Sequence, residues 1–334
     1  MSYRGRRRAV IPTTWTSRAS AADNLWQGVA YGAGVFAAVG ASGVGNRVMT
    51  SPDGIAWTIQ ASAADNSWVN VAFARGLFVA VAITGVGNRV MTSPDGVTWT
   101  PQASAADIDW RDIVFANGLF VAVASTGGPT NTVMTSPDGV NWTIRATPAT
   151  TAVWFGITYG NGQFVMVGSN TGANDVATSP DGINWTLRSS GFASQWWNVT
   201  YANGLYVAVA NIGAVNVMTS LDGITWTARV GLNAPWNSVI TANGVFVAVG
   251  IEPSVDNTVM TSQDGVTWTA QVEAAVNNWR RVTYANNRFV AVADSGVGNR
   301  VMTSDVSPGT LPYRKPQRGF HDDEQENEDE DVKV

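Results

Sequence analysis

Hydrophobic and polar positions follow one short pattern that recurs along the chain. One unit reads Trp68-Val-Asn-Val-Ala-Phe73, Ala-Arg-Gly, Leu77-Phe-Val-Ala-Val-Ala82, a glycine-rich loop, Asn88-Arg-Val-Met-Thr-Ser93, Pro-Asp-Gly and Val97-Thr-Trp-Thr100. These are four strand-sized runs rich in valine, threonine and aromatic residues, with turn residues between them and no helical periodicity. The pattern predicts a four-stranded antiparallel meander.

Two tryptophan series give the number of units. The pair Trp-Thr recurs at intervals of 41 to 43 residues, at Trp15, Trp57, Trp99, Trp142, Trp185, Trp226 and Trp268. A second series opens each unit, at Trp26, Trp68, Trp110, Trp154, Trp197, Trp236 and Trp279. A four-stranded unit of about 40 to 45 residues repeated around a ring is typical of β-propellers. The sequence therefore predicts an all-β, seven-bladed β-propeller, with the opening tryptophans packed between blades.

The phase of the repeat predicts how the ring closes. The last copy runs from Trp279 to Ser304 and lacks a Trp-Thr strand, whereas one strand of that type, Ile11 to Arg18, precedes the first full unit. The two pieces together complete the seventh blade, so the N-terminal strand closes the ring and removes its open edges. The predicted division is a basic arm at 1–10, a propeller at 11–304 and an arm with an acidic tail at 305–334.

Composition fits one large soluble domain and limits its chemistry. Of the 334 residues, 45% are hydrophobic and 13% are charged, which supplies enough apolar material for a sizeable core. The absence of cysteine excludes disulfides and thiolate chemistry. The single histidine, His321, lies in the acidic tail, so we expect neither histidine-based catalysis nor a metal site, and no cofactor.

Charge is concentrated in the two predicted arms. Four arginines lie within the first eight residues, and eight acidic residues lie between His321 and Val334. Four arginines are too few to indicate a nucleic-acid partner, and no apolar segment is long enough to predict a signal peptide or membrane insertion. The acidic run is typical of a solubilising tail. We expect the arms to contact other structural proteins of an assembly.

A recurrent turn carries a family resemblance. The segment Ser51-Pro-Asp-Gly-Ile-Ala-Trp57-Thr and its repeats resemble the Asp-box of sialidase-like propellers, with one residue fewer between the aspartate and the tryptophan. The aspartate of such a turn can accept backbone N–H bonds while glycine takes a positive φ. Calcium needs several oxygen ligands, and each turn offers one carboxylate. We therefore interpret the turn aspartates as structural: Asp53, Asp95, Asp138, Asp181, Asp222 and Asp264.

The two ends of the propeller differ in how constant their loops are. One end holds uniform turns, whereas the other holds the links between blades and the loops between second and third strands, which vary in sequence. Variable loops on a constant scaffold are the first place to expect recognition. Trp196 is the one tryptophan outside both series and is the strongest candidate. The candidate ligand-binding residues at this end are Asp109, Arg111, Trp154, Trp196, Glu252, Asp256 and Glu273.

A sialidase-like hydrolase needs an arginine cluster, a carboxylate and an activated tyrosine near the axis. The equivalent arginines Arg47, Arg89 and Arg300 begin third strands, roughly 10 Å outside the inner strand, where they diverge. The tyrosines are repeat equivalents that fit packing roles: Tyr31, Tyr159, Tyr201 and Tyr284. Three units also share Gly-Val-Gly-Asn-Arg-Val-Met-Thr-Ser, and such low blade individuality favours a scaffold over an enzyme.

Repeats with Ser-Pro-Asp-Gly-x-x-Trp-Thr resemble those of bacteriophage and bacterial surface or tail proteins. The resemblance implies a non-enzymatic virion component, associated with the tail or capsid, that mediates assembly or host-surface attachment. The expected location is the virion or an extracellular surface, reached without a Sec signal peptide. Two alternatives stay open, a carbohydrate-binding lectin and a divergent sialidase-like glycoside hydrolase.

Overall fold

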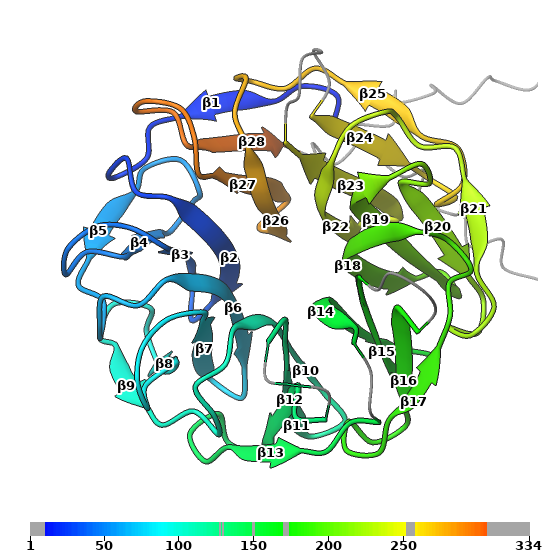
Figure 1. Cartoon of the computed structure of the whole chain (residues 1–334). Helices are drawn as coiled ribbons and strands as arrows, with labels where there is room; N and C mark the ends of the chain where they lie inside the picture. Colours follow the sequence, from blue (N-terminus) through cyan, green and yellow to red (C-terminus); the bar gives the residue numbers. More distant parts are fainter. Residues whose placement is uncertain are drawn as a thin grey trace, which may run out of the picture.

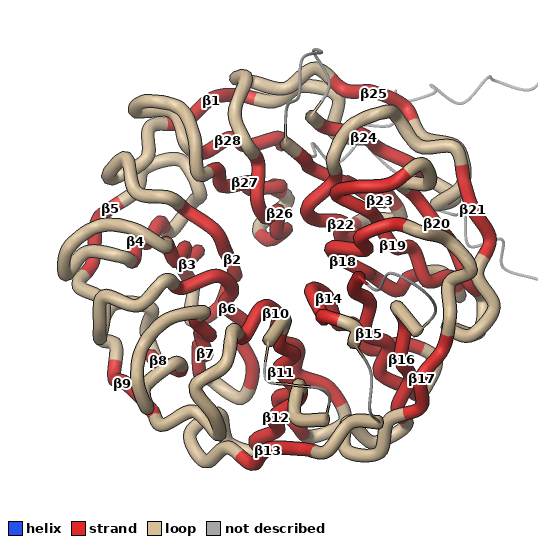
Figure 2. Tube along the Cα trace, in the orientation of Figure 1, coloured by secondary structure: helices blue, strands red, loops and turns tan. Residues whose placement is uncertain are grey.

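The computed structural model describes residues 11–126, 128, 130–148, 151–169, 174–251 and 258–305. Seven four-stranded antiparallel sheets surround a central axis as the blades of a propeller (Figure 1). The described residues form strands, turns and loops and no helix (Figure 2), so no described helix could cross a membrane. The predicted all-β, seven-bladed propeller is confirmed.

The strands fall into blades in chain order. Blade 1 holds β2 (Trp26–Gly32), β3 (Val35–Gly40), β4 (Val48–Ser51) and β5 (Thr58–Gln60). Blade 2 holds β6 (Trp68–Ala74), β7 (Leu77–Ala82), β8 (Val90–Ser93) and β9 (Thr100–Gln102). Blade 3 holds β10 (Trp110–Ala116), β11 (Leu119–Ala124), β12 (Val133–Ser136) and β13 (Thr143–Arg145). Blade 4 holds β14 (Val153–Gly160), β15 (Gln163–Ser169), β16 (Val176–Ser179) and β17 (Thr186–Arg188).

The remaining blades follow the same order. Blade 5 holds β18 (Ser194–Ala202), β19 (Leu205–Gly213), β20 (Val217–Ser220) and β21 (Thr227–Arg229). Blade 6 holds β22 (Trp236–Ala242), β23 (Val245–Gly250), β24 (Val259–Ser262) and β25 (Thr269–Gln271). Blade 7 holds β26 (Trp279–Ala285), β27 (Arg288–Ala293), β28 (Val301–Asp305) and β1 (Thr16–Arg18). The first strand of each unit lies nearest the axis in Figure 1.

The N-terminal strand closes the ring, as the repeat phase predicts. β1 pairs antiparallel with β28, with Thr16 opposite Thr303, and the Nε of Arg18 donates a hydrogen bond of 2.9 Å to Thr303 Oγ1. The strand is shorter than the predicted segment from Ile11 to Arg18. Trp15 is nevertheless buried and packs against Phe289, 6.3 Å between ring centroids, so β1 completes both the sheet and the core of blade 7.

The core lies between neighbouring blades. Trp68 at the start of β6 is fully buried against Ala37, Val39 and Val48 of the preceding blade. Its indole N–H donates a hydrogen bond of 3.0 Å to the Ala64 carbonyl in the link between the blades. The predicted packing of the opening tryptophans between blades is thus confirmed, because the flat, apolar ring fills the gap; the indole N–H also finds a partner among the described residues in every blade except blade 4.

The alignment of the tryptophan series needs one correction in blade 5. Trp196 pairs with Ala210 just as Trp154 pairs with Gly168, so Trp196 belongs to the series and Trp197 does not. Both Trp154 and Trp196 are fully buried. Their prediction as ligand-binding residues is wrong, since their side chains form the core between blades.

The turns that join third to fourth strands have the predicted geometry. In blade 1, Asp53 Oδ1 accepts hydrogen bonds from the backbone N–H of Ile55 (2.8 Å) and Ala56 (3.2 Å). Gly54 adopts a φ of 77°, which side chains disfavour, and its carbonyl accepts a bond from the Trp57 indole. The same backbone bonds recur at Asp95, Asp138, Asp181, Asp222 and Asp264.

Candidate binding site at the mouth of the central channel

Each inner strand begins with a β-bulge. In blade 3, Trp110 lies opposite Ala124 and Asp112 lies opposite Val123, so Arg111 has no partner on β11. A bulge of this kind redirects the side chain of the extra residue. The same shift occurs directly after the opening tryptophan of every blade. The extra residues are Gln27, Val69, Arg111, Phe155, Trp197, Asn237 and Arg280.

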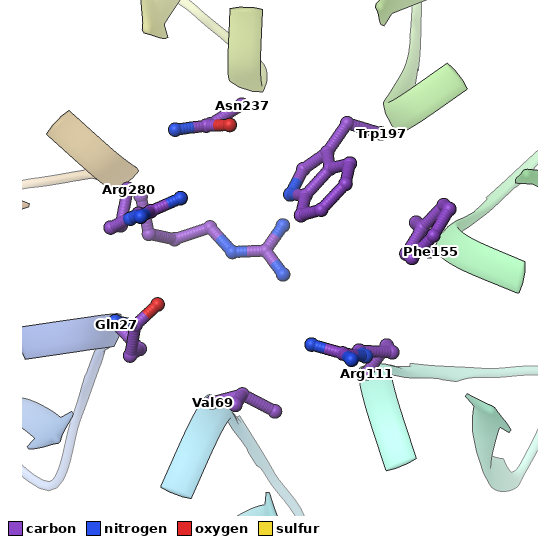
Figure 3. Close-up of a pocket in the computed structure, with 8 residues that line it drawn as sticks. Gln27, Val69, Arg111, Phe155, Trp197, Asn237 and Arg280 are labelled. Atoms are coloured by element: carbon purple, nitrogen blue, oxygen red, sulfur yellow. The ribbon is translucent and has the colours of Figure 1, made fainter. Parts of the chain in front are cut away.

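The seven bulge residues gather around the axis, as Figure 3 shows. Together with Arg281 they line a small pocket of about 50 Å³ that opens to solvent. The inner strands begin at the end of the propeller that carries the links between blades, which is the variable end that the sequence indicates for recognition. Symmetry-equivalent positions thus supply six different residue types to one pocket.

An aromatic pair and a guanidinium form one wall of the pocket. The rings of Phe155 and Trp197 stack with centroids 4.4 Å apart and planes 11° apart. The guanidinium carbon of Arg111 lies 6.0 Å from the Phe155 centroid, at the limit of a cation–π contact, and Arg111 Nε donates a bond of 2.7 Å to Ser125. Burial lowers the pKa of Arg111, while the Asp109 carboxylate opposes this shift, and a guanidinium remains charged.

Arg280 is held in place by an acidic residue behind the pocket. Its Nε lies 2.5 Å from Asp294 Oδ2, and the Gln27 amide donates a bond of 3.1 Å to the same oxygen. The Asp294 side chain is only 10% exposed. A single carboxylate therefore positions lining residues from two neighbouring blades, blade 7 and blade 1.

Arg281 joins opposite sides of the ring. Its terminal nitrogen Nη2 lies 3.0 Å from Asp112 Oδ1, and the Asp112 side chain is 5% exposed. β26 and β10, which carry the two residues, face each other across the channel in Figure 1. Asp112 also accepts bonds from the Asn70 amide and from the backbone N–H of Ile157. Burial raises the pKa of Asp112, and Arg281 and these hydrogen bonds oppose that shift.

The residue after the bulge ties neighbouring blades together around the axis. Asn198 Oδ1 accepts a bond of 2.9 Å from the Val239 backbone of the next blade, as Asp112 does from Ile157. In blade 4 this position is Gly156, where a Cβ would lie 2.8 Å from the Asn198 Cα. The ring beneath the pocket is therefore closely packed, and it fixes the bulges that hold the lining residues.

The described lining combines positive charge with an aromatic wall. Three guanidinium groups line the pocket, and no carboxylate, tyrosine or histidine is among its described lining residues. The contacts above engage Nε of Arg280 and one terminal nitrogen of Arg281. A guanidinium has five N–H donors, so further donors remain for an anionic ligand, which arginine binds in a bidentate manner.

The structure separates the predicted candidates into different roles. Arg111 lines the pocket, whereas Asp109 lies behind it, 3.2 Å from Arg89 and 3.9 Å from Arg111. Glu273 accepts a backbone bond of 3.2 Å from Thr258 away from the axis, which is a loop contact. Glu252 and Asp256 lie outside the described residues, as do the predicted arms apart from Asp305 in β28.

Six of the seven bulge residues escaped the sequence prediction. The signal is present, because the residue after the opening tryptophan differs from blade to blade, while that tryptophan and the valine or isoleucine three positions after it repeat. The sequence prediction placed Trp197 in the tryptophan series, so the variable position after the opening tryptophan was read one residue too late in blade 5. The expectation of low blade individuality is therefore corrected at the bulge residue and at the residue that follows it.

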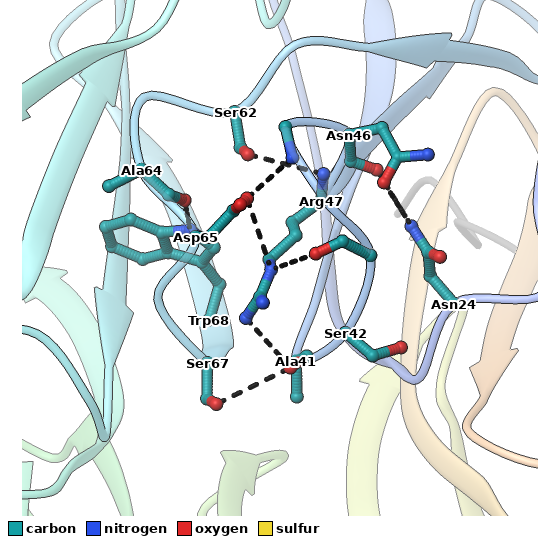
Figure 4. Close-up of polar contacts among 12 residues, drawn as sticks. Asn24, Ala41, Ser42, Asn46, Arg47, Ser62, Ala64, Asp65, Ser67 and Trp68 are labelled. Carbon is teal, nitrogen blue, oxygen red and sulfur yellow. Dashed lines mark hydrogen bonds and ion pairs between the residues drawn. The ribbon is translucent and has the colours of Figure 1, made fainter.

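The equivalent arginines of blades 7, 1 and 2 are structural, as their predicted divergence requires. Arg47 Nε donates to the Gly43 carbonyl (2.8 Å), Nη1 donates to the Ala41 carbonyl (2.9 Å), and Asp65 lies 3.5 Å away (Figure 4). Arg89 and Arg300 make the same contacts within their own loops. Each guanidinium joins its own loop to the link before the next blade, and none is among the residues that line the axial pocket.

Fold and pocket together define the chain as a seven-bladed propeller with a cationic, aromatic axial site at its variable end. No protein-family model matches the chain, and no curated protein sequence matches it. Among solved structures it is similar to YCF48 bound to a D1 peptide, with 15% identity, a TM-score of 0.66, and coverage of 89% of this chain and 97% of that one.

Two further solved structures share the fold. The streptogramin B lyase structure has a TM-score of 0.71 at 9% identity, covering 87% of this chain and 96% of the lyase. The WD40 propeller domain of Doa1 has a TM-score of 0.65 at 13% identity, with the same coverage of 87% and 96%. At such identities the likeness shows the propeller fold, which serves enzymes and non-enzymatic proteins alike.

Proposed function

We propose that this chain is a non-enzymatic recognition propeller that binds an anionic segment of a partner protein in its axial pocket. One observation carries the proposal: the seven equivalent bulge positions, together with the adjacent Arg281, bring three arginines and a stacked aromatic pair to the axis. Guanidinium groups bind carboxylates with defined geometry, and the Trp197 and Phe155 rings offer apolar contact beside them.

Protein is the favoured partner class. YCF48, which shares the fold, has been solved bound to a peptide. The setting that we propose is a virion, with the chain as a tail-associated or capsid-associated component that mediates assembly or attachment to a host surface. The Ser-Pro-Asp-Gly-x-x-Trp-Thr repeats support this setting through their resemblance to phage and bacterial surface proteins.

The hydrolase alternative has less support. A glycosidase needs two carboxylates, or a carboxylate and a tyrosine, beside the scissile bond, and the described lining of the pocket offers neither. The lectin alternative shares the aromatic wall with our proposal. A glycan array separates the two, because a lectin binds one or more of the arrayed glycans, acidic sugars included, whereas a protein-binding pocket binds none.

The proposal is tested by isothermal titration calorimetry with a hepta-glutamate peptide and a hepta-glutamine control. We expect the acidic peptide to bind, and Arg111→Gln together with Trp197→Ala to weaken binding by about tenfold or more, a loss of about 1.4 kcal/mol. Arg188→Gln is the matched control, because Arg188 lies on the outer strand β17 and carries the same charge. Equal affinity of the pocket variant and the Arg188 variant contradicts the proposed site.

A further inference from the structure

The acidic run is the chemical counterpart of the pocket within the same sequence. Residues 322–331 hold eight carboxylates and no basic side chain, whereas the pocket presents three guanidinium groups and no carboxylate among its described lining residues. We propose that the axial pocket of one copy binds the acidic segment 322–331 of a second copy, so that copies associate head to tail. This inference rests on the proposed function of the pocket as an anion-binding site.

The topology directs the acidic segment away from its own pocket. β28 ends at Asp305, whose carboxylate lies 2.5 Å from Arg288 Nε at the start of β27. Arg288 also donates to the carbonyl of Asp53, which belongs to a turn between third and fourth strands. Those turns lie at the opposite end of the blades from the bulges. The chain therefore leaves the described structure at the end of the propeller that faces away from the pocket.

The length of the connection favours a second copy. Sixteen residues, 306–321, separate β28 from the acidic run, and they span at most about 53 to 58 Å when fully extended. A path to the chain's own pocket around the outside of β1 rises about 23 Å along a seven-residue inner strand and returns about 19 Å across four strands, so it fits the connection only when most of it is extended. In a second copy stacked end to end, the pocket faces the end of the first copy at which β28 ends, so the acidic segment can reach it over a shorter path.

Exposed apolar residues lie at the pocket end as well. Val44, Val86 and Val297 are 86 to 90% exposed at the tips of the identical Gly-Val-Gly loops of blades 1, 2 and 7. The arginine and asparagine contacts of each loop hold these tips in place. A stacked copy covers them. Contact between unlike ends is heterologous, so it produces rings or filaments rather than a closed dimer.

Sedimentation velocity on the full chain tests the association. The key variant replaces all eight acidic residues of 322–331 by their amides, which keeps the length of the segment. We expect concentration-dependent larger species at low salt for the full chain and for Arg188→Gln, and monomers for the neutralised segment and for Arg111→Gln with Trp197→Ala. High salt should also dissociate the larger species. Larger species that persist when the segment is neutralised overturn the inference.

A peptide experiment separates this inference from the proposed function. A synthetic peptide of residues 321–331 is titrated into the chain with the neutralised segment, where we expect binding that the pocket variant weakens by about tenfold. If hepta-glutamate binds but the 321–331 peptide does not, the head-to-tail inference fails and the proposed function stands. If the peptide binds and the full chain is monomeric, the second copy is not the occupant. If neither peptide binds, both fail.

Discussion

Single residues hold the pocket in shape through carboxylates that lie behind it. Asp294 fixes Arg280 and Gln27, and Asp112 fixes Arg281 from across the channel. Because these carboxylates lie behind the guanidinium groups that line the pocket, N–H donors rather than carboxylate oxygens face its interior. The residues that give the pocket its chemistry and those that give it rigidity are therefore different.

Asp112 is expected to contribute most to stability among these carboxylates. Asp112→Asn leaves the Arg281 guanidinium, on a side chain only 15% exposed, without its ion-pair partner, so the free energy of unfolding should fall by about 3 kcal/mol. Asp109→Asn is the matched control, with a 32% exposed side chain and an expected loss of about 1 kcal/mol or less. Urea unfolding measures both values, and equal losses would show that the cross-channel pair is not the stronger contact.

At the scale of elements, two features organise the molecule: the bulge that opens every inner strand and the strand that closes the ring. The bulge turns one residue per blade toward the axis and leaves the rest of the strand in its ladder. β1 supplies the outer strand of blade 7 and brings Trp15 into the core beside Phe289. The closing strand has only three residues, but it completes both the sheet and the core of blade 7.

Deletion of residues 1–20 should destabilise the whole propeller strongly. The deletion exposes the edge of β28, removes the hydrogen bond from Arg18 to Thr303 and opens the core that Trp15 covers. Deletion of 1–10 alone, which leaves β1 intact, is the control and should change the melting temperature little. Thermal unfolding followed by circular dichroism compares the two, and equal melting temperatures would contradict the closure by β1.

At the scale of the whole molecule, the two ends of the propeller differ in how much their residues vary from blade to blade. The end with the aspartate turns repeats one hydrogen-bonded geometry, whereas the other end carries the varied bulge residues and the exposed valines. The turn carboxylates share a lowered pKa: Asp53, Asp95, Asp138, Asp181, Asp222 and Asp264. Because protonation of each of these carboxylates costs stability, the six together should make the folded propeller less stable in acid.

Stability should fall as the pH drops below about 4, the usual pKa of an unfolded aspartate. Burial raises the pKa of Asp181, but hydrogen bonds from Asn184, Ile183 and Ser179 outweigh it and lower the pKa to about 2. The unfolded chain therefore binds more protons between these values, and acid favours unfolding. Asp181→Asn should reduce the dependence of the melting temperature on pH in this range. An unchanged dependence would show that Asp181 does not contribute.

Much of the fold could be predicted because every blade repeats its local signals. The alternation of strands and turns, the tryptophan spacing and the missing fourth strand at Ser304 are local features, and they determined the blade count and the closure. The aspartate turns were predictable for the same reason, since all their bonds lie within three residues.

The pocket depended on tertiary structure. Arg111 and Arg281 lie 170 positions apart in the sequence and meet only because the ring brings blades 3 and 7 to one axis. A one-residue bulge decides whether Arg111 faces the channel or the sheet, and whether Trp196 or Trp197 is buried. The repeat, the ring and its closure could be predicted from the chain alone, because they follow from local periodicity. Only the folded ring decided which side chains converge, because that depends on register and on distance in space.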